Sequence, residues 1–139
     1  MTHPSVVLFE LYVAQVDDAE GRWDHAIETA RRVVAATEQG KVPAVQRAWA
    51  ITVLAKMVGR RAPREGLVLY ETALRLYAEQ TTSRRHGDTD LLREVTELAL
   101  RAGQPEVALR WFDRMPELAA QLAELRGQLR AAQLHGRAP

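Results

Sequence analysis

The chain has 139 residues, 47% of them apolar, which is enough for one domain with a buried core. Its 19 basic residues nearly balance its 18 acidic ones, which excludes a strong overall field that would draw it to nucleic acid or an anionic membrane. It contains no cysteine, so disulfide bonds, thiolate metal ligands and cysteine nucleophiles are excluded, and we expect a protein of the reducing cytoplasm.

The spacing of apolar residues predicts an all-α fold. Apolar side chains recur three and four residues apart, with no sustained alternation of period two. Prolines stand where helices would begin and glycines where helices would end, as at Pro4, Pro43, Pro63 and Pro105 and at Gly21, Gly59 and Gly103. The predicted helices cover residues 4–18, 23–38, 43–58, 63–80, 89–102, 105–114 and 117–134.

The first predicted helix is the most apolar segment. Its run of apolar residues from Val6 to Val16 includes Glu10 and Gln15 and is too short to cross a bilayer. One side of this helix, which we expect to face the core, carries Leu8, Phe9, Tyr12, Val13 and Val16. Val7 and Leu11 fall toward the opposite side, so we expect them to contact a partner, for which a second copy of the chain is one candidate.

The links inside three helix pairs are short, which predicts antiparallel hairpins over about 4–38, 43–80 and 89–115. After each link a small residue recurs, Ala26, Gly66 and Ala108, at intervals of 40 and 42 residues. A small side chain allows the two helices of a hairpin to approach closely. Four residues later stand Ala30, Tyr70 and Phe112, and the two aromatic rings are suited to filling the wedge beside the contact.

This pattern resembles the tetratricopeptide repeat family in its long form of about 40–42 residues, and "LVLYETALRLY" is the nearest single match. The resemblance covers residues 5–115. It implies a single domain over residues 1–139, a right-handed array of three hairpins with a capping helix over about 117–134. It also implies a groove, lined by the first helix of each hairpin, that binds a peptide or helix of a partner protein. A related helical array and an unrelated helical bundle are the alternatives.

In such a groove the partner-binding positions recur every three or four residues along each first helix. They are Leu11, Gln15, Gln46, Trp49, Lys56, Arg93, Glu97 and Arg101. Trp49 is the strongest candidate because a buried aromatic anchor dominates many small interfaces, although a place in the core suits it equally.

The last predicted helix carries a leucine seam that suits either a cap on the array or a short coiled coil. Self-association through this seam and the first helix is the second hypothesis for the chain. The residues expected to carry it are Val7, Leu11, Leu118, Leu122, Leu125 and Leu129.

No set of residues predicts chemistry. The histidines, His3, His25, His86 and His135, lack metal-ligand spacing, and we expect no metal and no cofactor. The acidic cluster of Asp17, Asp18 and Glu20 lies where helix capping or solvation explains it, so we expect no enzyme. Arginine pairs at 31–32, 60–61 and 84–85 leave nucleic-acid binding as a third, weaker hypothesis.

Overall fold

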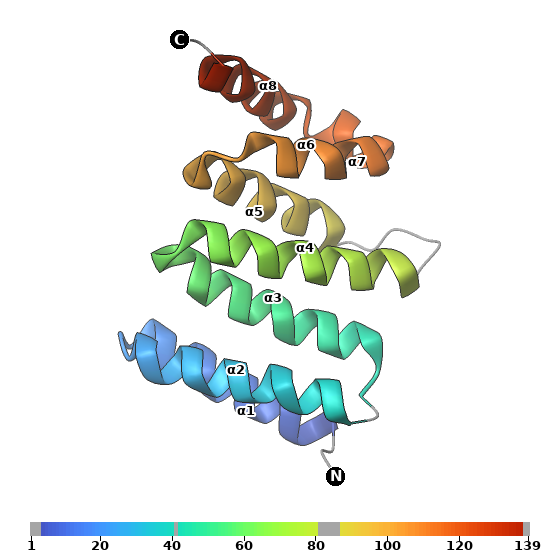
Figure 1. The fold of residues 1–139 in the computed structure, drawn as a ribbon. Helices are drawn as coiled ribbons and strands as arrows, with labels where there is room; N and C mark the ends of the chain where they lie inside the picture. Colours follow the sequence, from blue (N-terminus) through green and yellow to red (C-terminus); the bar gives the residue numbers. More distant parts are fainter. Residues whose placement is uncertain (1–3, 41, 81–86, 138–139) are drawn as a thin grey trace. The chain divides into compact units, whose positions relative to one another are not determined.

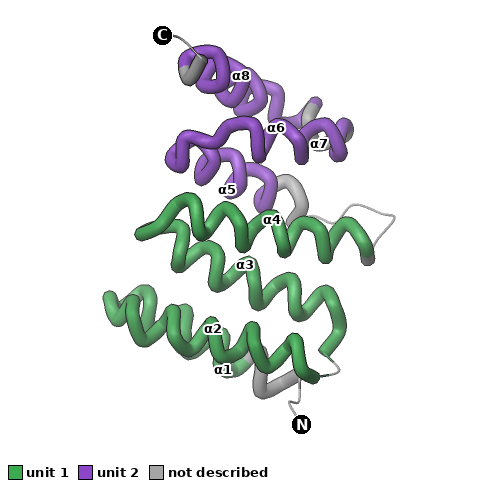
Figure 2. Tube along the Cα trace, in the orientation of Figure 1, with its two compact units in different colours: residues 1–82 green, residues 83–139 purple. Residues whose placement is uncertain are grey.

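The computed structural model describes residues 4–40, 42–80 and 87–137, and it shows an all-α protein with no strand among them (Figure 1). The chain divides into two compact units, Met1–Thr82 and Ser83–Pro139, which are described here one at a time (Figure 2). The all-α prediction is therefore confirmed, while the single continuous array stays a prediction.

The first unit consists of α1 (Pro4–Ala19), α2 (Trp23–Gln39), α3 (Ala44–Arg61) and α4 (Pro63–Gln80). Within this unit α1 packs against α2, α2 against α3 and α3 against α4, and α1 also contacts α3. Their predicted positions are confirmed to within three residues at either end. The core between them is formed by small and aliphatic side chains such as Ala30, Val33, Ile51 and Leu54.

The second unit consists of α5 (Gly87–Ala102), α6 (Pro105–Arg114), α7 (Pro116–Gln121) and α8 (Ala123–Arg137). Helix α6 packs against α5 and α8, and α8 also contacts α5. Trp111 and Phe112 are both buried in this unit. The hydroxyl of the fully buried Thr96 is satisfied within α5, since it donates to the Leu92 carbonyl at 2.8 Å.

The turns after α1 and α5 share one geometry. Gly21 and Gly103 have φ values of +86° and +69°, a region that glycine reaches without strain. At the first turn the Arg22 amide donates to the Asp17 carbonyl, and the Gly21 amide donates to the Asp18 carbonyl. At the second turn the Gln104 amide donates to the Ala99 carbonyl, and the Gly103 amide donates to the Leu100 carbonyl. This is the Schellman ending of a helix, and it places Ala26 and Ala108 at the same distance beyond their glycines, both fully buried. The repeated small residue thus occurs in a repeated local structure.

The joint between α3 and α4 is built differently. The sequence predicts that Gly59 ends a helix, which is wrong, because α3 continues to Arg61 and Gly59 is buried inside it. A Cβ placed on Gly66 of α4 would lie 2.4 Å from the Gly59 Cα and 2.8 Å from its amide nitrogen. The two backbones therefore touch at a pair of glycines, which is the close approach predicted from Gly66.

The last predicted helix is interrupted. The sequence predicts one helix over 117–134, but the structure has two, with Leu122 in the turn between α7 and α8. No glycine or proline marks this break. No described helix combines the length and the apolar character needed to span a membrane.

Candidate interaction surface

The predicted faces of α1 are reversed in the structure. Leu11, expected to face a partner, has 0% of its surface exposed and lies with Ala14 in the core of the first unit. Phe9, Tyr12, Val13 and Val16, expected to face the core, are 68%, 62%, 40% and 54% exposed. The reason is that α1 is apolar on several sides, so the periodicity of apolar residues does not decide which side is covered. The small side chain of Ala14 allows the neighbouring helices to pack closely against the side that carries Leu11.

The four exposed side chains form the α1 stripe, which we define as Phe9, Tyr12, Val13 and Val16. Their spacing of three, one and three residues places them on one side of the helix over about two turns, or about 10 Å. Single exposed apolar residues are ordinary, but a continuous row of large ones is typical of a surface that binds another protein.

Trp49 extends the α1 stripe onto α3. Its ring centroid lies 6.3 Å from that of Tyr12, with the ring planes inclined by 58°, a tilted aromatic contact. Trp49 is half-buried and packs against the core of the first unit. It therefore supports the core with one part of its ring system and presents another part beside the stripe.

The other predicted partner-binding residues are accessible to different degrees. In the first unit Gln15 and Lys56 are exposed, and Gln46 is half-buried with its Oε1 atom enclosed and without a hydrogen-bond donor among the described residues. In the second unit Arg93, Glu97 and Arg101 are exposed on α5 at four-residue spacing, so they share one face of that helix. Each set stands on its own unit.

The predicted self-association residues of the last helix are mostly turned inward. Leu122 and Leu129 are buried and Leu125 is half-buried, because α8 packs against α5 and α6 of its own unit. Leu122 and Leu129 are therefore corrected from self-association residues to core positions of the second unit. The side chains of Val7 and Leu118 lie outside the described part of the chain.

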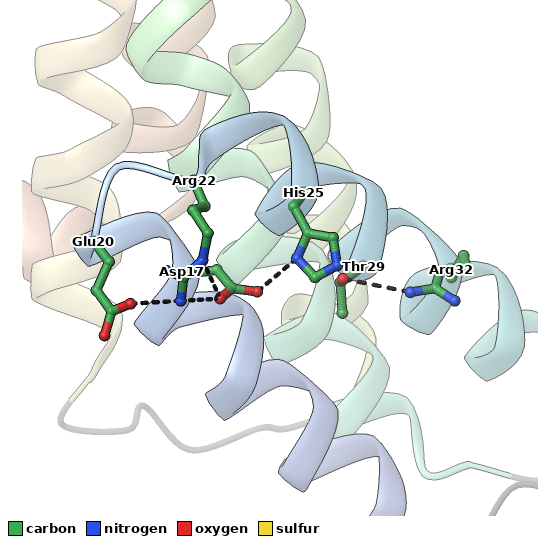
Figure 3. A network of polar contacts seen from close by, with 6 residues as sticks. All are labelled: Asp17, Glu20, Arg22, His25, Thr29 and Arg32. Atoms are coloured by element: carbon green, nitrogen blue, oxygen red, sulfur yellow. Dashed lines mark hydrogen bonds and ion pairs between the residues drawn. The ribbon is translucent and has the colours of Figure 1, made fainter.

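A polar network that the sequence did not predict holds the turn between α1 and α2 (Figure 3). Asp17 is only 6% exposed; its Oδ1 accepts from Arg22 Nε at 3.0 Å and Nη2 at 2.8 Å, and its Oδ2 accepts from His25 Nδ1 at 2.7 Å. Hydrogen bonds from Arg22 and then from His25 lower the pKa of Asp17 below its usual value, and the same bond raises the pKa of Arg22. The other ring nitrogen of His25 forms no hydrogen bond with the described residues.

Two further ion pairs tie this turn to the end of α3. Arg60 pairs with Asp18, and Arg61 Nη1 pairs with Asp24 Oδ1 at 2.7 Å. The Arg61 guanidinium also stacks over the Trp23 ring at 4.6 Å from its centroid. The carboxylates of the acidic cluster therefore form ion pairs with arginines. Arg60 and Arg61, which the sequence offers as an arginine pair, are themselves paired with Asp18 and Asp24.

The remaining candidates for chemistry are not brought together within the described part of the chain. Among the described residues, no group of His, Asp and Glu side chains is arranged to hold a metal ion. His25 and His135 are exposed on different units, while His3, His86 and the arginine pair 84–85 lie outside the described residues. The sequence matches no model of a known protein family and has no significant match among curated proteins.

Proposed function

We propose that this protein is a non-enzymatic interaction module that binds an amphipathic helix of a partner protein on the α1 stripe and Trp49. The observation that carries the proposal is the exposure of four large apolar side chains in one row, beside a half-buried tryptophan. Burying an exposed side chain of this size on a partner contributes about 1.5–3 kcal/mol to the free energy of binding. This free energy is not gained while the side chain stays in contact with water.

The layout of the surface suits a helix better than an extended strand. The row on α1 has the spacing of a seam between two packed helices, which a partner helix would match with apolar residues at the same intervals. Tyr12 and Trp49 are aromatic residues of the kind that dominate binding energies, and the polar side chains of Glu10 and Gln15 lie at the margin. Such a centre and rim are the usual anatomy of a small protein interface.

Charge indicates the chemistry of the partner. Helix α1 carries Glu10, Asp17 and Asp18 and no basic residue over Pro4–Ala19. Asp17 and Asp18 are paired with arginines, whereas Glu10 is exposed and makes no ion pair with the described residues. A partner helix with lysine or arginine beside its apolar row would complement Glu10, which a second copy of α1 would not.

The tetratricopeptide-like array belongs to the same proposal. The two Schellman turns with equally placed alanines, and the close glycine pair between α3 and α4, support a repeated hairpin. In that arrangement Gln46, Trp49 and Lys56 on α3, and Arg93, Glu97 and Arg101 on α5, would continue the binding groove from α1. The absence of cysteine agrees with a place in the cytoplasm.

Self-association is the second candidate, now through the α1 stripe rather than through Leu11 or the leucine seam. The row of Phe9, Tyr12, Val13 and Val16 is exposed on one side of α1, and two-fold pairing of such apolar rows would bury it against the same row of a second copy. Sedimentation velocity across a hundredfold range of concentration distinguishes the two candidates. A concentration-dependent dimer that Val16→Ser abolishes would favour self-association, and a strict monomer would remove it.

The proposal is tested by quantitative affinity purification from the native cells. The double variant Phe9→Ser, Val16→Ser replaces the two end residues of the four-residue stripe. Val68→Ser is the matched control because Val68 is 62% exposed on α4 of the same unit. We expect one set of proteins to be retained by wild type and Val68→Ser and lost by the double variant. Equal retention by all three forms, with all three equally folded by circular dichroism, would contradict the proposal.

A further inference from the structure

An open groove in the second unit has the features of a small-ligand site. It has a volume of about 600 Å³ and is formed by α6, α7 and α8. The residues that line it are Phe112, Asp113, Pro116, Ala120, Ala123, Arg126, Gly127 and Arg130. Its walls are thus mostly apolar, with two arginines and one aspartate as the charged groups.

The arginines have unused hydrogen-bonding capacity. Arg126 Nη2 reaches Asp113 Oδ1 at only 3.4 Å, a long single contact, and the buried Arg126 Nε has no hydrogen-bond partner among the described residues. Arg130 is exposed and forms no ion pair or hydrogen bond within the described chain. A buried donor without an acceptor costs free energy, which an anionic oxygen would recover with a small turn of the guanidinium.

The spacing of the two arginines suits one shared anion. Positions 126 and 130 are one helical turn apart on α8, so their side chains are neighbours on the same face. The described lining holds two arginines and Asp113, a net charge of one positive unit, which matches a carboxylate better than a doubly charged phosphate. Two guanidinium groups can bind both oxygens of one carboxylate.

The apolar part of the groove has room for the body of such a ligand. Gly127 lies between the two arginines in sequence and lines the groove, and a Cβ placed on it would meet nothing within 4 Å. The other short side chains of the lining are Pro116 and Ala120 from α7 and Ala123 from the start of α8, and they leave space in the groove. A glycine here keeps the groove open at the cost of some helix stability.

We propose that this groove binds a carboxylate carried on an apolar group, with Arg126 and Arg130 holding the carboxylate and the alanine-lined wall receiving the apolar group. Two sources share this chemistry: a free organic acid and the C-terminal residue of a peptide with an apolar side chain. The site lies within the second unit, so it is independent of the α1 stripe and of the function proposed for it.

The test is a titration of the ¹⁵N-labelled full chain followed by backbone amide shifts. The probes are N-acetyl-L-phenylalanine, as the peptide C-terminus, octanoate, as the free acid, and N-acetyl-L-phenylalanine amide, as the neutral counterpart. We expect saturable shifts in residues 112–130 with one or both acids, and binding at least tenfold weaker for the amide. The acid that binds more tightly identifies the source.

Variants separate binding at the groove from general anion effects. Arg126→Gln and Arg130→Gln should each weaken acid binding about tenfold, and Gly127→Leu should block it by filling the groove without a change of charge. Arg110→Gln is the matched control, since Arg110 is an exposed arginine on α6 that does not line the groove. The proposal is overturned if neither acid gives saturable shifts at tens of millimolar, if the amide binds equally well, or if Arg110→Gln weakens binding as much as Arg130→Gln.

Discussion

Replacement of Gly66 by alanine should separate α3 from α4 and destabilise the first unit. The added Cβ would lie 2.4 Å from the Gly59 Cα, 2.8 Å from the Gly59 amide nitrogen and 3.0 Å from the Ala55 carbonyl oxygen. Non-bonded carbons settle at about 3.5–4.0 Å, so the helices must move apart by about 1 Å at this point. All three contacts are backbone atoms, which no change of rotamer can relieve.

The expected magnitude is the balance of two effects. Overpacking of a close contact costs about 1–3 kcal/mol, and more where backbone must shift. Alanine also gains about 1 kcal/mol over glycine in a helix interior. We therefore expect Gly66→Ala to lower the free energy of unfolding by up to about 2 kcal/mol.

The assay is urea unfolding followed by far-ultraviolet circular dichroism, with Gly127→Ala as the matched control. Gly127 is also a helical glycine, but a Cβ there meets nothing within 4 Å, so its replacement should stabilise α8 by about 1 kcal/mol. The same substitution thus has opposite signs at the two sites. If Gly66→Ala stabilised the protein as Gly127→Ala does, the backbones of α3 and α4 would not touch in the way described.

Three further predictions follow from single residues. Leu11→Ala should lower the free energy of unfolding by about 2–5 kcal/mol, because Leu11 is fully buried. Val16→Ser on the exposed stripe should change the free energy of unfolding by less than about 1 kcal/mol. Similar values for the two variants in urea unfolding would mean that α1 presents a different side to the core. Leu129→Ala should destabilise the second unit by a similar 2–5 kcal/mol without changing the molar mass in light scattering, and loss of a dimer instead would restore the leucine seam as an interface. Because the pKa of Asp17 is lower in the folded protein than in the unfolded chain, its contribution to stability is present above the unfolded value of about 3.9 and is lost as the pH falls through the folded value. Asp17→Asn should therefore reduce stability at neutral pH and flatten the loss below about pH 4, and thermal unfolding with the same acid slope in both proteins would contradict this assignment.

The helical pattern of the fold is readable from the sequence because local rules decide it. Pro63 and Pro105 begin helices, Gly21 and Gly103 end them, and Gly66 marks a close approach of two backbones. Each of these effects depends on the dihedral angles or the size of one residue, which the residue type specifies. Gly59 misled the same reasoning because a glycine inside a helix and one at its end look alike in sequence.

The exposed apolar surface of α1 is harder to predict because it depends on which side of a helix is covered. The row with Phe9 and the row with Leu11 are both apolar, and only the packing against α2 and α3 decides between them. No glycine or proline in the sequence marks the break at Leu122. The break goes with the burial of both Leu122 and Leu129 in the second unit, which depends on packing between helices and not on the local sequence. The hydrogen bonds from Arg22 and His25 to Asp17 depend on the turn at Gly21. The sequence does contain a signal for this network, because Asp17, Arg22 and His25 lie on the two sides of a glycine that ends a helix.

The central claim, that the α1 stripe is the protein's binding surface, is tested most directly by photo-crosslinking in the native cells. A benzophenone amino acid is placed at position 12, on the stripe, and in a separate control at position 75, which is exposed on α4 of the same unit. The account predicts a crosslink from position 12 alone, mapped by mass spectrometry to a helical segment of another protein with an apolar row and basic neighbours. Crosslinks that are the same from both positions, or that join position 12 to another copy of this chain only, would contradict it.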